Sequence, residues 1–402
     1  MSVFRNISVW VFGKEGDIFA DGATQALIAA SSVLVMGSML VSPLIADLAT
    51  VFSVSETAAG WLIVSFTAAA ATTLPLIGAL ADRIERKVVL SVGLILFGLA
   101  GAAVGVVERF DVALGLRALQ GVGFACSMPI ILTLFGDLYS GPRETTVQAM
   151  RVSANSVINT IIPLFAGVLF VYSWRYPFTI YLTALPIAAW VWVTIPEVDV
   201  SNDWSVRTYV RKMSVFLSDV PIALLMFSFF FRFVVFYGLI TYISVLAVQE
   251  TGLSVVAVGT LLSVRGAVKT VSSTQAGRLS LSYDPAFLSF LSFLCIAIGT
   301  TVLGSFPTTA MLVVGVIIWG LGDGLLSPCQ KSLVNRLSKS AYRGGAMSVA
   351  LTFQNVGKVV GPVAVGILLS RIDPAPAFIL LGIVGGGIGT LVLLGVWLLT
   401  DS

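Results

Sequence analysis

The chain has 402 residues, of which 57% are hydrophobic and only 11% are charged, with a formal net charge of +3. A soluble domain has about a quarter of its residues charged, so this composition excludes an ordinary soluble protein and predicts a surface covered by lipid. The chain has no histidine, its three cysteines are scattered, and it lacks the spacing of a phosphate-binding P-loop. We therefore expect no metal, no cofactor, no ATP hydrolysis and no nucleic-acid partner.

Twelve apolar stretches predict membrane-crossing helices, because a helix needs ~20 apolar residues to span the bilayer core. No stretch between them is long enough to fold as a separate domain. The predicted crossings are 25–46, 57–77, 88–107, 112–134, 149–171, 176–195, 221–246, 256–275, 286–304, 309–330, 345–369 and 376–398. The predicted fold class is an all-α membrane protein.

The loops between these crossings differ in positive charge. With the N-terminus inside, fourteen Lys and Arg residues fall in cytoplasmic segments, and the outside loops hold only Arg109, Arg175 and Arg371. Cytoplasmic loops carry the excess of positive residues in membrane proteins. We therefore expect a multi-pass protein of the cell membrane with both termini in the cytoplasm.

The sequence also repeats itself at an offset of 199 residues. The matching pairs are Gly60 and Gly259, Gly78 and Gly277, Gly121 and Gly320, Gly123 and Gly322, Pro129 and Pro328, Pro163 and Pro362, Gly167 and Gly366, and Pro177 and Pro376. The offset spans six crossings, so each helix and its copy run in the same direction, as in halves related by an axis along the membrane normal. The predicted parts are a cytoplasmic segment 1–24, a six-helix bundle 25–195, a cytoplasmic linker 196–220, a second bundle 221–398 and a tail 399–402.

Three short patterns lie at fixed places in this repeat. The loop after the second crossing, GALADRIERK, holds Gly78, Asp82, Arg83, Arg86 and Lys87. The fourth crossing contains RALQGVGFACSMP, with Arg117, Gln120 and Gly121. The fifth and eleventh crossings contain NTIIPLFAG and GKVVGPVAVG, with the helix-bending residues Pro163, Gly167, Gly361 and Pro362.

These patterns resemble the loop, fourth-helix and fifth-helix motifs of the major facilitator superfamily, over residues of about 25 to 398. SWRYPF at 173–178 also resembles the start of the sixth helix in its drug-exporter-like members. The resemblance implies two six-helix bundles, a central cavity and alternating access. It also implies that Asp82 latches the cytoplasmic side by pairing with the positive N-terminal end of the eleventh helix. A solvated basic loop is the alternative interpretation.

Charged residues deep inside the predicted crossings are costly in lipid and usually line a cavity or pair with each other. Arg232 lies ~16 Å into the seventh helix at 1.5 Å per residue. Arg265, Lys269, Asp323 and Lys358 are at comparable depth. Because Arg265 and Lys269 are four apart, they share one helix face and repel each other unless an acid lies between them. Asp323 is one candidate acid and a bound substrate anion is the other, so both a structural network and a substrate site stay open.

Polar amides fall at depths related by the repeat. Asn155 corresponds to Gln354, and Asn159 to Lys358, on the fifth and eleventh helices that flank the cavity in the resembled family. Phe66 corresponds to Arg265, so one bundle is expected to supply an aromatic wall and the other a charge. Hydrogen bonding between helices is the alternative role for the amides.

The leading hypothesis for function is a monomeric secondary active transporter of a small organic solute. The resemblance favours proton-coupled efflux of amphipathic compounds, and the deep basic residues favour a substrate with an acidic group. Any proton coupling is expected to use carboxylates because histidine is absent. Organic-anion uptake by a symporter or uniporter, a sensor that binds without turnover, and a membrane-embedded enzyme remain as alternatives.

Overall fold

The structure is a computed structural model that describes residues 18–81, 84–196, 219–305, 308–338 and 343–400. Within these residues it contains no strand, and twelve helical segments are long and apolar enough to cross a membrane. These segments are Gly22–Val51, Glu56–Leu74, Arg86–Val106, Phe110–Leu138, Thr146–Tyr172, Tyr176–Thr194, Val220–Thr251, Val255–Leu279, Pro285–Ser305, Thr309–Leu337, Val349–Leu369 and Pro374–Thr400. The predicted all-helical membrane fold with twelve crossings is confirmed.

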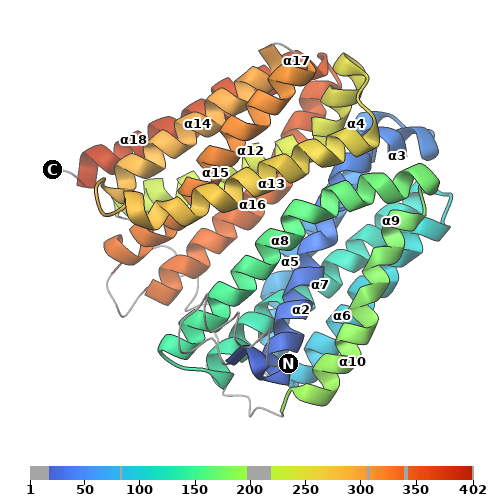
Figure 1. The fold of residues 1–402 in the computed structure, drawn as a ribbon, viewed down its shortest axis with the longest axis vertical. Coiled ribbons are helices and arrows are strands. Elements are labelled where there is room, and N and C mark those ends of the chain that lie inside the picture. Colours follow the sequence, from blue (N-terminus) through green and yellow to red (C-terminus); the bar gives the residue numbers. More distant parts are fainter. Residues whose placement is uncertain (1–17, 82–83, 197–218, 306–307, 339–342, 401–402) are drawn as a thin grey trace. The chain divides into compact units, whose positions relative to one another are not determined.

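The chain forms these segments from the following elements (Figure 1). They are α2 (Gly22–Met39), η2 (Ser42–Leu44), α3 (Ile45–Val51), α4 (Glu56–Ala59), α5 (Trp61–Ala81), α6 (Arg86–Ala103), η3 (Val104–Val106), α7 (Phe110–Leu138), α8 (Pro142–Tyr172), α9 (Tyr176–Thr179), η4 (Ile180–Thr183), α10 (Ala184–Thr194), α12 (Val220–Thr251), α13 (Val255–Leu279), α14 (Pro285–Ser305), α15 (Thr309–Leu337), α16 (Arg343–Leu369), α17 (Pro374–Leu380), η6 (Leu381–Gly386) and α18 (Gly387–Thr400).

Side chains before the helices satisfy backbone groups that helix ends leave without intrahelical partners. Asp21 accepts hydrogen bonds from the backbone of Ala23 and Thr24 at the start of α2. Ser254 and Thr308 cap α13 and α15 in the same way. At the other end of α12, Gly252 adopts a left-handed conformation with φ of 65°, which glycine does without steric cost.

The first and twelfth crossings are each interrupted. The first contains the 3-10 turn η2 between α2 and α3, where Pro43 lacks the N–H needed to continue the helix. The twelfth contains the π-helical turn η6 at a stretch that includes Gly382, Gly385 and Gly386. The sequence predicted one uninterrupted stretch in each place, because hydropathy measures apolar length and does not detect a local change of helix type.

Contacts between α-carbons divide the chain into two compact units. The first unit comprises the described residues of Met1–Val41, Ser65–Ile162 and Tyr172–Trp204, and the second comprises those of Ser42–Val64, Pro163–Val171 and Ser205–Ser402. The first and second segments of the second unit come from the first half of the sequence. The division into bundles 25–195 and 221–398 therefore stays a prediction. The linker 196–220, the segment 1–24 and the tail 399–402 lie largely outside the described residues.

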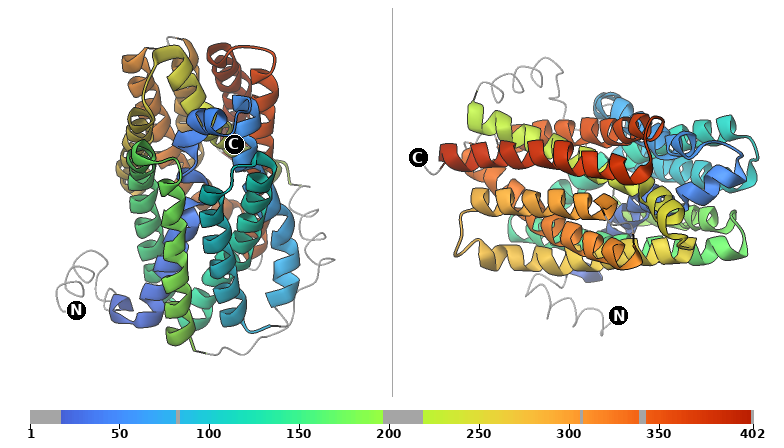
Figure 2. Two further views of the ribbon diagram at one scale, coloured as in Figure 1. Left: turned by 90° about the vertical axis from the view of Figure 1, so that its right-hand side faces the viewer. Right: turned by 90° about the horizontal axis from the view of Figure 1, so that it is seen from above.

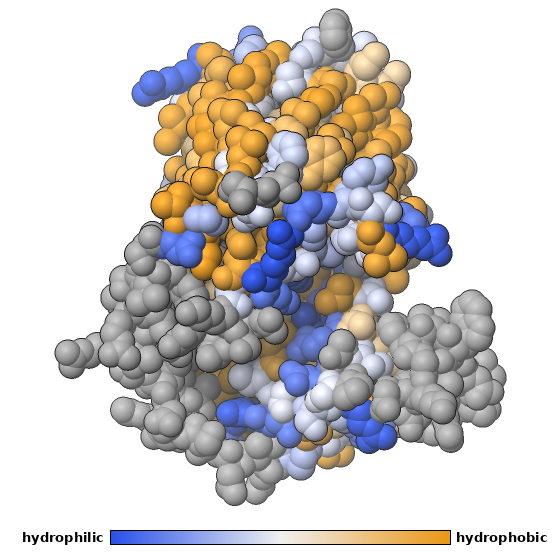
Figure 3. All heavy atoms as spheres, turned by 90° about the vertical axis from the view of Figure 1, so that its left-hand side faces the viewer, coloured by the Kyte–Doolittle hydropathy of each residue, from blue (hydrophilic) through white to orange (hydrophobic). Residues whose placement is uncertain are grey.

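Within the second unit, α14 packs against α15 and α18, α13 against α15, and α12 against α16 and α18. Figures 1 and 2 show α15 running alongside both α13 and α14. In the first unit, α6 packs against α7 and α10, and α2 packs against the same two helices. In Figure 3, apolar side chains gather over the upper part of the face shown, which fits contact with lipid tails.

The two units repeat the same helix contacts at the offset of 199 residues. Gly121 of α7 lies against the backbone of Phe66 in α5, and Gly320 of α15 lies against the backbone of Arg265 in α13. A second pair of contacts, Gly123 with Phe97 and Gly322 with Ile296, is also related by the offset. The repeat found in the sequence therefore has a geometric counterpart, with small residues letting helices approach closely in both copies.

Candidate functional site

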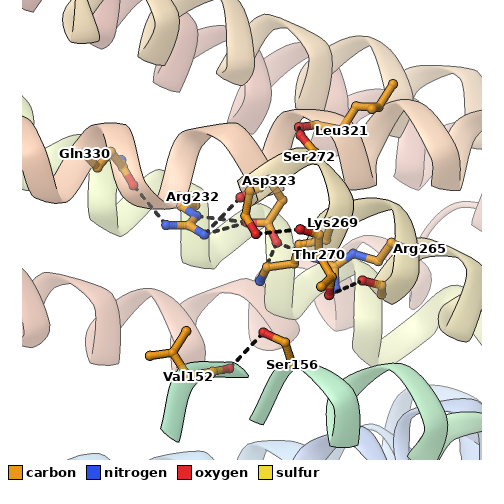
Figure 4. A network of polar contacts seen from close by, with 12 residues as sticks. Val152, Ser156, Arg232, Arg265, Lys269, Thr270, Ser272, Leu321, Asp323 and Gln330 are labelled. Carbon is orange, nitrogen blue, oxygen red and sulfur yellow. Dashed lines mark hydrogen bonds and ion pairs between the residues drawn. The ribbon is translucent and has the colours of Figure 1, made fainter. Parts of the chain in front are cut away.

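Three cationic side chains meet at one carboxylate in the second unit, and the four residues come from three helices (Figure 4). Asp323 of α15 accepts hydrogen bonds at Oδ1 from Nε and Nη2 of Arg232 in α12, at 3.0 and 2.7 Å. Its Oδ2 is shared by Arg265 and Lys269 of α13, with the Lys269 Nζ at 2.8 Å. We call Arg232, Arg265, Lys269 and Asp323 the charge cluster. The structure thus brings together four of the deep charged residues that the sequence singled out.

Close packing of α15 on α13 places Asp323 between the two cations of α13. Arg265 and Lys269 are one helical turn apart, so their side chains leave the same face. A β-carbon on Gly320 would lie 2.9 Å from the carbonyl oxygen of Arg265, and one on Gly324 would lie 2.5 Å from that of Lys269. These two glycines, four residues apart, therefore set the helix spacing at which Asp323 reaches both cations.

A second layer of hydrogen bonds orients Arg232. Its Nη1 donates to Oε1 of Gln330 at 3.1 Å, and Nε2 of Gln330 donates to Ser228 Oγ at 2.8 Å. Gln330 is on α15, two turns from Asp323, so one helix supplies two of the acceptors for this guanidinium. Only 6% of the Arg232 side chain is exposed.

Aromatic rings surround the cations of the cluster. The Arg265 guanidinium carbon lies 4.0 Å from the ring centroid of Trp319 and 4.6 Å from that of Phe236. Lys269 Nζ lies 5.7 Å from the Phe236 ring, and Arg232 lies 5.4 Å from the Phe233 ring. Such cation–π contacts stabilise a buried cation by about 0.5–2 kcal/mol each.

The charges of the cluster do not balance. Three cations share a single carboxylate, which leaves an excess of positive charge among the residues of the cluster. Arg232 and Arg265 are each 6% exposed and Asp323 is 2% exposed, whereas Lys269 is 33% exposed. Buried excess charge is unfavourable unless an opposite charge joins it. Lys269 is the member of the cluster that a second anion can reach.

The other predicted lining residues lie on α8 and α16. Lys358 Nζ donates to Asn355 Oδ1 at 2.9 Å and lies 5.6 Å from the Phe233 ring. Asn155 Nδ2 donates to Ser31 Oγ at 2.9 Å, which joins α8 to α2. Asn159 and Gln354 are both partly buried. Phe233 therefore has two cations beside it, one from the charge cluster and one from α16.

The fourth-helix motif forms a separate buried cluster in the first unit. Arg117 is fully buried; it donates through Nη2 to the Gly37 carbonyl at 2.7 Å and through Nη1 to Gln120 Oε1. Its guanidinium carbon lies 4.7 Å from the Phe66 ring centroid, and Tyr181 also donates to the Gly37 carbonyl at 3.1 Å. Phe66 is only 4% exposed, so it packs against a cation of its own unit. Gly121 provides the close contact with α5 described above.

The loop motif is described only in part. Asp82 and Arg83, and with them the predicted latch, lie outside the described residues, and Gly78 lies in α5. Arg86 at the start of α6 forms an ion pair with Asp137 at the end of α7. Lys87 Nζ lies 5.0 Å from the Trp192 ring in α10. The two basic residues at the end of the motif thus join helix ends within the first unit.

A matching ion pair joins helix ends in the second unit. Arg336, which corresponds to Asp137 at the offset of 199, pairs with Asp284 just before α14. Partial burial raises the pKa of Asp284, but the hydrogen bond from Arg336 and the backbone N–H of Ala286 outweigh it and hold that pKa below its usual range. Both copies therefore contain this ion pair, but the helix end that carries the acidic residue in one copy carries the basic residue in the other.

The helix-bend residues are positions of close backbone contact. Pro163 and Pro362 lie inside α8 and α16. The carbonyl of Pro163 lies against Gly259, and Gly167 lies against the backbone of Val255 and Val256. Gly361 lies against the Val234 carbonyl of α12. All of these contacts lie within the second unit.

Three contributors were not predicted. Trp319 and Gln330 complete the charge cluster, and Asp137 pairs with the loop motif. Trp319 and Gln330 lie one turn before and two turns after Asp323 on α15, so helical spacing from Asp323 is the signal that would have found them. Among the described residues, no group of three Asp, Glu or Cys side chains is placed to hold a metal ion.

Comparison with known proteins agrees with this architecture. The model of the Major Facilitator Superfamily matches residues 27–280 and 245–402. The bacillibactin exporter of Bacillus subtilis is 24% identical over 375 residues, which cover 86% of this chain and 89% of the exporter. The multidrug transporter protein MdtP of the same organism is 29% identical over 123 residues, 30% of this chain and 23% of that protein. The chain thus spans less than a quarter of MdtP and most of the bacillibactin exporter.

The fold is also that of solved transporters. The structure of a D-xylose–proton symporter superposes with a TM-score of 0.76 at 16% identity, covering 94% of this chain and 97% of the symporter. Twelve crossings, repeated halves and a family match over most of the sequence define a membrane transporter and not an enzyme. The chain belongs to the Major Facilitator Superfamily.

Proposed function

We propose that this transporter exports an amphipathic organic compound with an acidic group, by alternating access and with protons as the coupling ion. The observation that carries this proposal is the charge cluster, in which three cations share one carboxylate and Lys269 is one-third exposed. An acidic substrate supplies the negative charge that the cluster lacks, in a low-dielectric site where ionic hydrogen bonds are strong.

Two further observations support export and proton coupling. The bacillibactin exporter, a relative that covers 86% of the chain, is an exporter, and MdtP is a multidrug transporter. The D-xylose–proton symporter has the same fold. We place the transporter in the cell membrane as a monomer with both termini in the cytoplasm, in keeping with the distribution of Lys and Arg in the loops.

Uptake of an organic anion is the second candidate, because the same cluster serves an anion moving in either direction. A sensor with this fold would bind the anion without moving it. The three functions differ in turnover. A proton-coupled exporter moves the anion in the direction opposite to the protons, and a proton symporter moves it in the same direction as the protons. A sensor binds the anion without moving it.

The proposal is tested first by thermal unfolding of the purified protein with organic anions, lipophilic cations and sugars at constant ionic strength. A ligand that binds only the folded state stabilises it by about 2.7 kcal/mol at a hundredfold excess over Kd. We expect organic anions to stabilise the protein and Lys269→Gln to remove that effect while lowering the melting temperature little.

The anion that stabilises most is then used in proteoliposomes with an imposed pH gradient. We expect the gradient to drive its accumulation on the side of higher proton concentration, and an ionophore that collapses the gradient to abolish it. Stabilisation by lipophilic cations alone, unaffected by Lys269→Gln, would contradict an acidic substrate. Binding of anions without any flux across the membrane would indicate a sensor.

A further inference from the structure

The three cations of the charge cluster differ in how firmly they are held. Arg232 makes two hydrogen bonds to Asp323 Oδ1 and a third to Gln330. Arg265 bonds to Oδ2 and lies against Trp319 and Phe236. Lys269 holds Asp323 by one contact of 2.8 Å and is the most exposed of the three. If Lys269 leaves, both oxygens of Asp323 keep a guanidinium partner, so the buried carboxylate stays paired.

The side chain of Lys269 is also better suited than an arginine to exchange one anionic partner for another. Its ammonium is a point charge with three donors on a flexible stem, whereas the planar arginine groups are fixed in a fork. The side chain lies on α13 beside Phe236, and 33% of it is exposed. The ammonium is therefore able to meet a second anion while the two arginines stay with Asp323.

An aromatic surface continues from Lys269 along α12. Phe233, Phe236 and Tyr237 are all half-buried and lie on one helix face, with spacings of three and four residues. Their ring centroids are 5.3 to 6.3 Å apart. We call these three residues the aromatic strip. It ends at Lys269 beside Phe236 and at Lys358 beside Phe233, so an apolar planar body fits along it with an acidic group at one end.

We propose that an aromatic organic acid binds along the aromatic strip and that its acidic group replaces Asp323 as the ion-pair partner of Lys269. This inference rests on the proposed function and adds the class of the substrate and the role of Asp323. Asp323 competes with the substrate for Lys269. It forms an ion pair with Lys269 until the acidic group of the substrate replaces it, and the ion pair forms again when the substrate leaves. The exchange of one anion for another keeps the ammonium paired at each stage.

Two substitutions that are expected to change the affinity in opposite directions test the exchange. Asp323→Asn removes the competing charge, so we expect the affinity for an aromatic carboxylate to rise by severalfold. Lys269→Gln removes the ammonium and is expected to lower it by about tenfold or more, since a charged hydrogen bond contributes 1.5–3 kcal/mol. Arg278→Gln, an exposed residue at the end of the same helix, is the matched control for the loss of one positive charge. Isothermal titration calorimetry of the purified transporter with a naphthoate measures all three.

Lys269→Arg gives a second test that does not depend on folding of Asp323→Asn. The variant keeps the charge, but an arginine binds a carboxylate with two parallel hydrogen bonds and releases it less readily. We expect affinity for naphthoate to fall about threefold or more while the melting temperature stays the same or rises. An unchanged affinity would show that the site uses only the charge of Lys269 and would overturn the exchange.

The aromatic part of the proposal is tested with paired ligands. Wild type is expected to prefer naphthoate to its fully saturated analogue and to the uncharged naphthamide, and Phe236→Leu is expected to reduce only the first preference. If anions bind and are transported but Asp323→Asn weakens binding as Lys269→Gln does, Asp323 is a structural partner and the exchange is wrong, although the proposed function stands. If no organic acid binds the wild-type protein, the proposed function itself is contradicted, and the exchange with it.

Discussion

Tyr139 lies just beyond α7 and holds the start of α2. Its hydroxyl donates to Asp21 Oδ2 at 2.5 Å and lies 2.5 Å from Thr24 Oγ1. Partial burial and the hydrogen bond to the Asp21 carboxylate raise the pKa of Tyr139 to about 12. Because Asp21 also caps α2, this phenol links the end of one crossing to the first turn of another within the first unit.

We expect Tyr139→Phe to lower the free energy of unfolding at neutral pH by about 1 kcal/mol, the usual contribution of one hydrogen bond. The pKa of Tyr139 is higher in the folded protein than the ordinary value of about 10, so the folded state binds its proton more tightly. The contribution is therefore complete below about pH 10 and is lost as the pH rises toward 12. Melting temperatures of both proteins over this range measure it, and a difference that stays constant above pH 10 would contradict the assignment.

At the scale of helices, the contact of α15 with α13 positions the charge cluster. Gly324→Ala places a methyl group 2.5 Å from the Lys269 carbonyl, where only movement of a helix relieves the overlap. We expect a loss of stability of about 1–3 kcal/mol, as for overpacked cores, together with weaker binding of the organic anion. Thermal unfolding and calorimetry measure the two effects.

Gly277→Ala is the matched control on α13, because no neighbouring atom lies within 4 Å of the added methyl group. Replacing an exposed helical glycine by alanine normally stabilises by about 0.5–1 kcal/mol. Equal losses of stability and of binding in the two variants would show that the α13–α15 spacing does not govern the site.

The two copies of the repeat keep attractive side-chain contacts at equivalent positions, although the residues that carry the charge differ. At the offset of 199, Asp137 corresponds to Arg336, and each pairs with a residue of opposite charge at the start of a neighbouring helix, Arg86 or Asp284. Phe66 corresponds to Arg265, and each makes a cation–π contact across the same helix pair, with the cation on opposite helices. Attraction depends on unlike partners and not on which helix carries the charge.

The crossings and the deep charges were predictable from the sequence because both depend on local properties, namely apolar length and the cost of a charge in lipid. The spacing of Arg265 and Lys269 predicted their shared face and their need for an acid. The interruptions at Pro43 and at η6 were not predicted, since apolar content is unchanged there. The partners of Arg86 and Arg232 were not predicted either, because Asp137 and Gln330 are distant in sequence and helix packing alone brings them close.

For the whole molecule, the proposed orientation in the membrane rests on the distribution of Lys and Arg. In a background with Cys126, Cys295 and Cys329 replaced by alanine, we expect Ser370→Cys to react with a membrane-impermeant maleimide in intact cells. Ser282→Cys is expected to react only after the membrane is opened. Both serines are exposed in loops, after α16 and before α14. The reverse pattern of labelling would place both termini outside.

We expect the excess positive charge of the charge cluster to make the transport cycle responsive to voltage as well. A membrane potential of 100 mV acts on each elementary charge with about 2.3 kcal/mol over the full thickness of the bilayer. Any displacement of the cluster along the membrane normal during alternating access therefore costs or releases electrical work. An inside-negative potential favours the conformation in which the cluster lies closer to the cytoplasm, and a bound anion cancels part of that bias. We therefore expect the rate of cycling to depend on the membrane potential of the cell as well as on the concentrations of solute.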